Sequence, residues 1–281
     1  MGEANSSVTR VWPVFDTLFA YDPTGARWLD SLLRMAPGFR ETQPGPLLPS
    51  LSRFDRKLPR NFALVLDDRS SQLARLRSCF EVDYPPPERF LRWLIEHPGS
   101  LTWPLESKKT PRKFGGKTEA SRHALIAGDT ATHDLAVLAL EKSGTSGSRG
   151  KWWAFEGFTS VDCVLETDSL LVFIEGKRTE PISAATDWYP QRNQIVRNVE
   201  VASCAAAEAR KNFGVILCAE EPVPVLEQDF IEGLPHLSQP DRDALRTHYW
   251  GCITWNQIVS ALCPGLRLRV ISKRQSGYVS D

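Results

Sequence analysis

The sequence predicts an α/β protein, and three segments in its second half support that prediction. Two short runs rich in Val, Leu, Ile and Phe lie close together, one from Ser160 to Glu166 and the other from Ser169 to Glu175. A long stretch from Gln191 to Arg210 contains neither Pro nor Gly, and an almost wholly apolar run follows it. Short apolar runs favour strands and a long uninterrupted stretch favours a helix, so strands and a helix alternate here.

The first two runs predict an antiparallel hairpin. The polar pair Thr167-Asp168 stands between them and suits a tight reversal of the chain. If the turn has two residues, Glu166 pairs with Ser169, and this register extends along both strands.

Three charged residues then meet at one end of the hairpin. The register places Asp162 opposite Phe173, with Glu175 one diagonal step away on the same face. Lys177 shares this face because side chains alternate along a strand. Two carboxylates beside Val and Phe are costly to bury and repel each other, and a bound cation removes both problems. Carboxylate oxygens suit Mg²⁺ or Mn²⁺, which usually take one or two protein carboxylates and keep several waters.

This arrangement resembles a known family. Asp162 and the run Glu175-Gly176-Lys177 are similar to the motif of the PD-(D/E)XK phosphodiesterase superfamily, whose members share a restriction-endonuclease-like core. Val161 stands where the motif has Pro, at a position that varies in the family. The resemblance implies that Asp162, Glu175 and the carbonyl oxygen of Gly176 hold Mg²⁺ or Mn²⁺. It also implies that Lys177 orients or activates the attacking water.

The segment after the hairpin predicts a helix and then a strand covered on both faces, from Asn212 to Ala219. The apolar residues of the helix fall at helical spacing and should pack on the sheet: Ile195, Val199, Ala202 and Ala206. Gln191, Gln194 and Asn198 form a second, amide-rich stripe. The resemblance implies that this helix contributes a Gln to the site, and Gln194 is the best match. The other interpretation of Gln194 is an exposed amide on a solvated helix face.

The segment before the hairpin completes the pattern. Thr130 to Lys142 predicts a helix, and Trp152 to Phe155 predicts a short aromatic strand. The order is then helix, three-stranded antiparallel meander, helix, strand, which matches the core that the resemblance implies. The resemblance also implies an additional acid from the first helix, with Glu119 and Glu141 as candidates, although a surface position is the commoner interpretation of either.

Two regions are predicted. Residues 1–115 should form a mainly helical accessory region, and residues 116–281 a nuclease-like domain with a C-terminal helical extension. The helical stretches expected in the first region are Thr17 to Met35, Ser70 to Phe80 and Pro87 to His97. A partner protein bound through this region and a homodimer both stay open.

Positive charge gathers just before the predicted core, although the formal net charge of the 281 residues is zero. Neutralising phosphates releases counterions, so a dense basic run favours contact with nucleic acid. The alternative is that the run is only a solvated linker. The predicted nucleic-acid-binding residues are Lys108, Lys109, Arg112, Lys113 and Lys117.

Other classes find little support in the sequence. The six cysteines form no C-x-x-C pair and several lie in apolar runs, which indicates reduced thiols. With no apolar run long enough to span a bilayer, we expect a soluble, cytoplasmic protein. Zinc-finger spacing, H-E-x-x-H and G-x-S-x-G are absent. Pro111 stands where a phosphate-binding loop ending in Gly-Lys-Thr would need its first Gly, which argues against a nucleoside triphosphatase.

The sequence therefore predicts a Mg²⁺-dependent nuclease acting on nucleic acid, with DNA favoured over RNA. Its predicted catalytic residues are Asp162, Glu175, Lys177 and Gln194. The alternative is a catalytically inactive nuclease-like fold that binds nucleic acid or another protein. A purely structural ion cluster is a third interpretation, and buried ion clusters are a poor source of stability.

Overall fold

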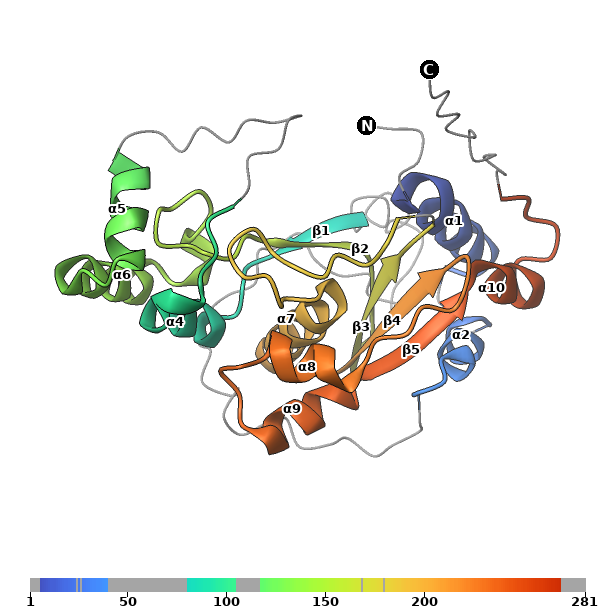
Figure 1. Ribbon diagram of the computed structural model, residues 1–281. Coiled ribbons are helices and arrows are strands. Elements are labelled where there is room, and N and C mark those ends of the chain that lie inside the picture. The colour runs from blue at the N-terminus through green and yellow to red at the C-terminus, as the bar shows by residue number, and fades with distance from the viewer. Residues whose placement is uncertain are drawn as a thin grey trace, which may run out of the picture.

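The computed structural model describes residues 6–39, 80–104 and 117–268, apart from the single residues 24, 26, 168 and 179. A five-stranded mixed sheet forms its centre (Figure 1), with the strands in the order β1-β2-β3-β4-β5. The strands are β1 (Phe80–Tyr84), β2 (Thr159–Glu166), β3 (Leu170–Gly176), β4 (Asn212–Ala219) and β5 (Tyr249–Thr254). β2 runs antiparallel to β1 and β3, whereas β3, β4 and β5 are parallel. The predicted α/β class is confirmed.

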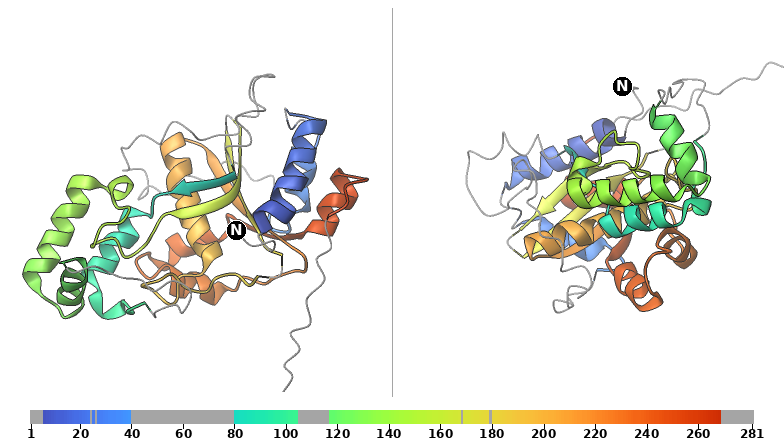
Figure 2. Two further views of the ribbon diagram at one scale, coloured as in Figure 1. Left: turned by 90° about the horizontal axis from the view of Figure 1, so that it is seen from above. Right: turned by 90° about the vertical axis from the view of Figure 1, so that its left-hand side faces the viewer.

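Helices cover both faces of the sheet. They are the π-helix η1 (Ser7–Val11), α1 (Trp12–Tyr21), α2 (Leu29–Met35), α4 (Glu88–Glu96), η3 (Pro98–Ser100), α5 (Lys117–Ile126), α6 (Thr130–Ser143), η4 (Thr145–Gly147), α7 (Gln194–Ala209), α8 (Glu227–Gly233), α9 (Gln239–Arg246) and α10 (Trp255–Leu262). α7, α8 and α9 lie on one face, whereas α1, α2 and α10 lie on the other (Figure 2). α4, α5 and α6 form a separate lobe beyond the β1 edge. In the described part of the chain, no helix is long and apolar enough to cross a membrane.

α7 is the helix that the stretch without Pro or Gly predicts, although it begins at Gln194 rather than Gln191. Asn193 sets its start, because the side chain of Asn193 accepts a hydrogen bond from the amide of Ile195 at 2.8 Å. The four predicted apolar residues, Ile195, Val199, Ala202 and Ala206, are all buried in it. This face packs on β3 and β4, as expected.

β4 has the predicted bounds and is buried along nearly its whole length. A parallel strand between two helical layers has no solvated face, which explains its unbroken apolar sequence. Gly214 lets the next strand approach, since a Cβ at this position would lie 2.3 Å from the indole of Trp250. A larger residue at Gly214 would displace Trp250.

The prediction that Trp152 to Phe155 form the first strand of the meander is wrong. Residues 152–155 form turns and irregular structure, and Trp153 and Phe155 are buried in the helical lobe instead of a sheet. The third antiparallel strand is β1, which pairs with β2 in the register Val82 with Val161. The chain thus enters the sheet at β1, leaves it to build the lobe, and returns at β2.

The N-terminal helices also differ from the prediction. The stretch expected from Thr17 to Met35 is divided into α1 and α2, with Pro23 and Gly25 between them. Pro lacks the amide hydrogen that a helix interior needs, and Gly25 adopts a positive φ of 75°, so the helix breaks here. α4 confirms the helix predicted near Pro87 to His97. The helix expected from Ser70 to Phe80 lies outside the described residues, except for Phe80 in β1.

Two hydrophobic clusters organise the described residues, and they do not follow a division at residue 115. The larger cluster joins Val11 and Phe15 of the N-terminal helices to Val161 and Ile174 of the sheet. The smaller cluster lies in the lobe and includes Phe90, Leu140 and Phe155. The N-terminal helices therefore belong to the layer that covers the sheet.

Candidate active site

The hairpin of β2 and β3 carries the predicted site, in a register different from the predicted one. Glu166 pairs with Leu171 rather than Ser169. The reversal is shifted by one residue along the chain, because the amide of Thr167 donates to the carbonyl of Leu170 at 2.8 Å. The hydroxyl of Thr167 also accepts hydrogen bonds from the amides of Ser169 and Leu170, at 3.3 and 3.0 Å. Continuing the pairing of Cys163 with Ile174 by one residue brings Asp162 opposite Glu175.

Asp162 is held by two donors, one to each carboxylate oxygen. The amide of Gly176 donates to Asp162 Oδ2 at 2.7 Å, and the hydroxyl of Ser7 donates to Asp162 Oδ1 at 2.5 Å. Ser7 belongs to η1, which contacts both β2 and β3. The N-terminal helical layer thus reaches the site directly.

Glu175 is 2 % exposed and accepts hydrogen bonds on both oxygens. Lys177 Nζ lies 2.8 Å from Glu175 Oε1, and Gln194 Nε2 donates to the same oxygen at 2.6 Å. Asn198 Nδ2 donates to Glu175 Oε2 at 2.8 Å. The amide-rich stripe of α7 therefore faces the sheet at this point, so Gln194 is not a solvated surface amide.

Both carboxyl groups have a raised pKa, and burial is the largest cause in each. Burial raises the pKa of Glu175 most, the charge of Asp162 adds to this, and Lys177 opposes it, so that the pKa reaches about 7. Burial also raises the pKa of Asp162, against the hydrogen bonds from Ser7 and Gly176. Glu81 of β1 adds further negative charge beside Asp162. One lysine does not neutralise this set of acids, and a divalent cation would restore the balance.

The backbone of the motif is fixed at the end of β3. The amide of Lys177 donates to the carbonyl of Cys218 at 2.7 Å, and the indole of Trp255 donates to the carbonyl of Lys177 at 2.8 Å. Gly176 sits against η1, because a Cβ there would lie 2.4 Å from Val11 Cγ2 and 3.2 Å from Asp162 Oδ2. Only Gly at this position allows the helix and the acid to approach the strand so closely.

The donor set fits a hard divalent cation. Asp162 and Glu175 supply carboxylates and Gly176 supplies a carbonyl, which suits an ion that takes few protein ligands and keeps its waters. Within the described residues, no group of three or more His, Cys, Asp or Glu side chains could hold a metal ion.

The lobe does not bring the other predicted acids to this site. In α5, Glu119 Oε1 lies 3.8 Å from His123 Nε2. In α6, Glu141 Oε1 lies 3.3 Å from Arg92 Nη1. Both helices belong to the lobe (Figure 1), whereas η1 contacts β2 and β3 and its Ser7 donates to Asp162. The basic residues Lys108, Lys109, Arg112 and Lys113 lie outside the described residues, as does the side chain of Lys117 at the start of α5.

Sequence reasoning missed three residues that contact or surround the acids. Asn198 stands one helical turn after Gln194, so the amide stripe was a signal for it. Ser7 gives no signal, because its role depends on how η1 packs on the sheet. Glu81 depends on the pairing of β1 with β2, and its φ of 60° is unusual for a residue other than Gly.

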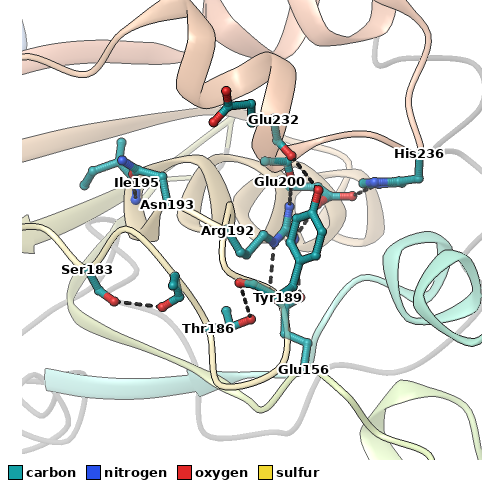
Figure 3. A network of polar contacts seen from close by, with 12 residues as sticks. Glu156, Ser183, Thr186, Tyr189, Arg192, Asn193, Ile195, Glu200, Glu232 and His236 are labelled. Carbon is teal, nitrogen blue, oxygen red and sulfur yellow. Dashed lines mark hydrogen bonds and ion pairs between the residues drawn. The ribbon is translucent and has the colours of Figure 1, made fainter. Parts of the chain in front are cut away.

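A second polar network fixes the segment that leads into α7 (Figure 3). Arg192 is fully buried, and its guanidinium donates to Glu156 Oε1 at 2.9 Å, to Glu200 Oε2 at 2.6 Å and to the carbonyl of Gly233 at 2.7 Å. His236 Nε2 lies 2.6 Å from Glu200 Oε1. Burial opposes ionisation of Glu200, yet His236 and Arg192 lower its pKa to about 2. Arg192 stands two residues before Gln194, so this network positions the start of the helix that holds Glu175.

Comparison with known proteins gives no match: no protein-family model, no curated protein and no solved structure corresponds to this chain. The function must therefore be argued from the geometry of the site.

Proposed function

We propose that the protein is a Mg²⁺-dependent nuclease that hydrolyses phosphodiester bonds, with DNA as the favoured substrate. The observation that carries this proposal is the convergence of Asp162, Glu175 and Lys177 at one end of the hairpin. Lys177 Nζ is only 2.8 Å from a Glu175 carboxylate that is 2 % exposed. Such a cluster contributes little to stability, which favours a chemical role.

The fold arrangement is consistent with the PD-(D/E)XK resemblance. Asp162 on β2 and Glu175-Gly176-Lys177 at the end of β3 stand in the positions of that motif. α7 follows the hairpin and β4 follows α7, as the restriction-endonuclease-like core implies. We propose that β1, β2 and β3 are the three antiparallel strands of that core, with the helical lobe inserted between β1 and β2.

Each residue has a defined role in this proposal. Asp162, Glu175 and the carbonyl of Gly176 would hold Mg²⁺ or Mn²⁺, which when bound supplies a water of lowered pKa and draws charge off the phosphate. Lys177 keeps a fixed positive charge beside the acids and donates hydrogen bonds to the attacking water or to the phosphate. Gln194 and Asn198 each donate to one oxygen of Glu175, which fixes the orientation of its carboxylate.

The first experiment measures cleavage of supercoiled plasmid, single-stranded DNA and RNA in Mg²⁺ or Mn²⁺. The parent protein is compared with Glu175→Ala, and with Glu221→Ala as a control for an exposed Glu outside the site. We expect cleavage by the parent and the control and at least a hundredfold loss in Glu175→Ala, which removes a metal ligand. Equal cleavage by all three would refute the site.

Binding of nucleic acid without cleavage would favour the alternative, a catalytically inactive nuclease-like fold that serves as a binding module. Retention of both acids and the lysine in one hydrogen-bonded cluster argues against that alternative. The same assay reports whether DNA or RNA is cut and whether ends are needed. A homodimer or a partner protein bound through the N-terminal region would be detected by the mass of the active species.

A further inference from the structure

A cavity of about 450 Å³ lies at the junction of the helical lobe and α7. Its walls come from residues 148–158 before β2, residues 183–188 after β3, Arg122 of α5 and Arg197 of α7. The volume lies within the range of cavities that bind nucleotide-sized groups. None of these walls belongs to the set that holds the acids.

Positive charge dominates the walls of this cavity. Four cationic side chains line it, namely Arg122, Arg149, Lys151 and Arg197, against the acids Glu156 and Asp187. Two of these charges are already paired, because Glu156 binds the buried Arg192 and Arg149 Nη2 lies 2.8 Å from Asp83 Oδ2. Arg122, Lys151 and Arg197 then stand against Asp187. Arg122 is fixed in place, since its guanidinium donates to the carbonyls of Trp152 and Lys151 and lies 4.6 Å from the ring centroid of Trp188. A cavity of this composition attracts an anion.

Two buried polar atoms in the walls have no hydrogen-bond partner within the part of the chain that the structure describes. They are the hydroxyl oxygen of Ser148, which is 1 % exposed, and Nε of Arg197. A buried polar group without a partner is costly, so such groups usually mark a place where a ligand or water completes the bonding. Both groups can donate a hydrogen bond to a phosphate oxygen.

The cavity is connected to the catalytic acids through Gln194. The amide of Ser183, which lines the cavity, lies 3.5 Å from Gln194 Oε1, and the amide of Gln194 donates to the carbonyl of Ser183 at 2.8 Å. The nitrogen of the same side-chain amide, Gln194 Nε2, donates to Glu175 Oε1 at 2.6 Å. Arg197 follows Gln194 by one turn of α7, so one helix face presents both sites. Figure 3 shows Ser183 and Asn193, which caps α7, on neighbouring segments.

We propose that this cavity binds a phosphate of the nucleic-acid strand that is cut at Glu175. This assignment of a strand-binding subsite rests on the proposed nuclease function. Arg197, Lys151 and the hydroxyl of Ser148 provide the contacts, and Arg122 provides fixed positive charge. Phosphate contacts of this kind position a strand in register with a catalytic site without reading its sequence.

The test measures binding of a fluorescein-labelled single-stranded DNA 12-mer by anisotropy, in EDTA, where the acids repel the strand equally in every variant. The double variant Lys151→Ala/Arg197→Ala is compared with Lys142→Ala/Arg246→Ala, which removes two exposed positive charges outside the cavity. Each phosphate contact to a single strand changes the slope of log K against log salt by about 0.7. Because the cavity holds one phosphate, the cavity variant should lose about 0.7 from the slope and bind about fivefold more weakly at 0.1 M salt, with 1 M salt as the reference.

An affinity and a slope equal to those of the control variant would overturn the proposal. Because Arg197 is partly buried, Lys151→Glu provides a second variant that changes only an exposed side chain. Reversing the charge at position 151 should weaken DNA binding at least as much as removing that charge. Unchanged DNA binding by Lys151→Glu would again overturn the proposal. A folded state equal to that of the parent is checked by the thermal melting curve.

A second arm identifies the source of the phosphate by titrating inorganic phosphate into the labelled complex. If phosphate displaces the labelled DNA only as far as the rise in ionic strength explains, and equally from the parent and the control variant, the result supports a strand-binding site. Displacement of the DNA from the parent protein at submillimolar phosphate would show that the cavity binds a free anion. That result would overturn the assignment to a nucleic-acid strand. Binding is measured without cleavage, so loss of the nuclease function with Glu175→Ala and loss of this subsite are separate results.

Discussion

Lys177 places a positive charge 2.8 Å from Glu175, and its role can be separated from that of the acids. Replacing Lys177 with Ala removes the fixed charge but leaves both carboxylates and the Gly176 carbonyl in place. We expect Mn²⁺ binding to be retained and turnover to fall about 100-fold or more, the size of effect seen when one donor to a developing charge is lost. Calorimetric Mn²⁺ titration and cleavage rates measure the two effects.

The control for this substitution is Lys142→Ala, which removes an exposed lysine from α6. Unchanged turnover in Lys177→Ala would show that the lysine only balances the charge of Glu175. Loss of Mn²⁺ binding together with turnover would instead indicate that Lys177 supports the arrangement of the acids.

The raised pKa of Glu175, about 7, predicts how metal binding depends on pH. The carboxyl group keeps its proton below pH 7, and a metal must displace that proton, so the apparent Mn²⁺ affinity should fall about tenfold for each pH unit below 7. Without metal, the free energy of unfolding changes with pH in the opposite direction to the metal affinity. The folded-state pKa lies above the ordinary value of 4.5 for a Glu side chain, so this group stabilises the fold fully below pH 4.5 and loses that contribution as pH rises through 7.

Mn²⁺ titrations between pH 5.5 and 8.5 test the prediction. The parallel control follows the free energy of unfolding without metal in the parent and in Glu175→Gln, which cannot titrate at this position. An Mn²⁺ affinity that stays constant over the range would contradict the raised pKa.

At the scale of elements, local patterns predicted α7 and β4 well. The stretch without Pro or Gly and the apolar run are signals contained within single segments, and packing on the sheet reinforces them. The face of the hairpin was also predicted, although its register was not. Because the true register differs from the predicted one by two residues, Asp162 and Glu175 remain on one face and come directly opposite each other.

The elements that were missed depend on contacts between distant segments. β1 precedes the lobe in sequence but pairs with β2 after it, and no local feature of Phe80–Tyr84 indicates that partner. Trp153 and Phe155 carry strand-like side chains, yet the lobe offers a cluster that buries them. Ser7 reaches Asp162 only because η1 packs against Gly176. Such tertiary contacts override local propensity.

At the scale of the whole molecule, Arg192 joins parts that the two hydrophobic clusters leave separate. Its guanidinium contacts Glu156 beside the lobe, Glu200 of α7 and the carbonyl of Gly233 in α8, and it lies 3.8 Å from the ring centroid of Phe90 in α4. We expect the lobe and the sheet to unfold together because this network ties them to one another. If the lobe unfolded before the sheet, the cavity and the start of α7 would be disturbed.

Replacing Arg192 with Leu leaves the buried Glu156 without its cation and Glu200 with His236 as its remaining partner. Removal of one partner from a buried ion cluster is expected to lower the free energy of unfolding by about 3–5 kcal/mol. Arg246→Leu is the matched control, because its ion pair with Glu227 is about half exposed and should contribute about 1 kcal/mol or less. Urea unfolding followed by tryptophan fluorescence and by circular dichroism measures both losses.

The triple variant Arg192→Leu/Glu156→Gln/Glu200→Gln separates charge from packing. If unpaired charge causes the loss, neutralising both acids should recover most of the stability of the fold. Cleavage should recover with it, since α7 would again hold Gln194 against Glu175. A single Arg192→Leu variant as stable as Arg246→Leu would show that the lobe and the sheet do not depend on this network. In that case the position of α7 would have to come from its apolar face alone.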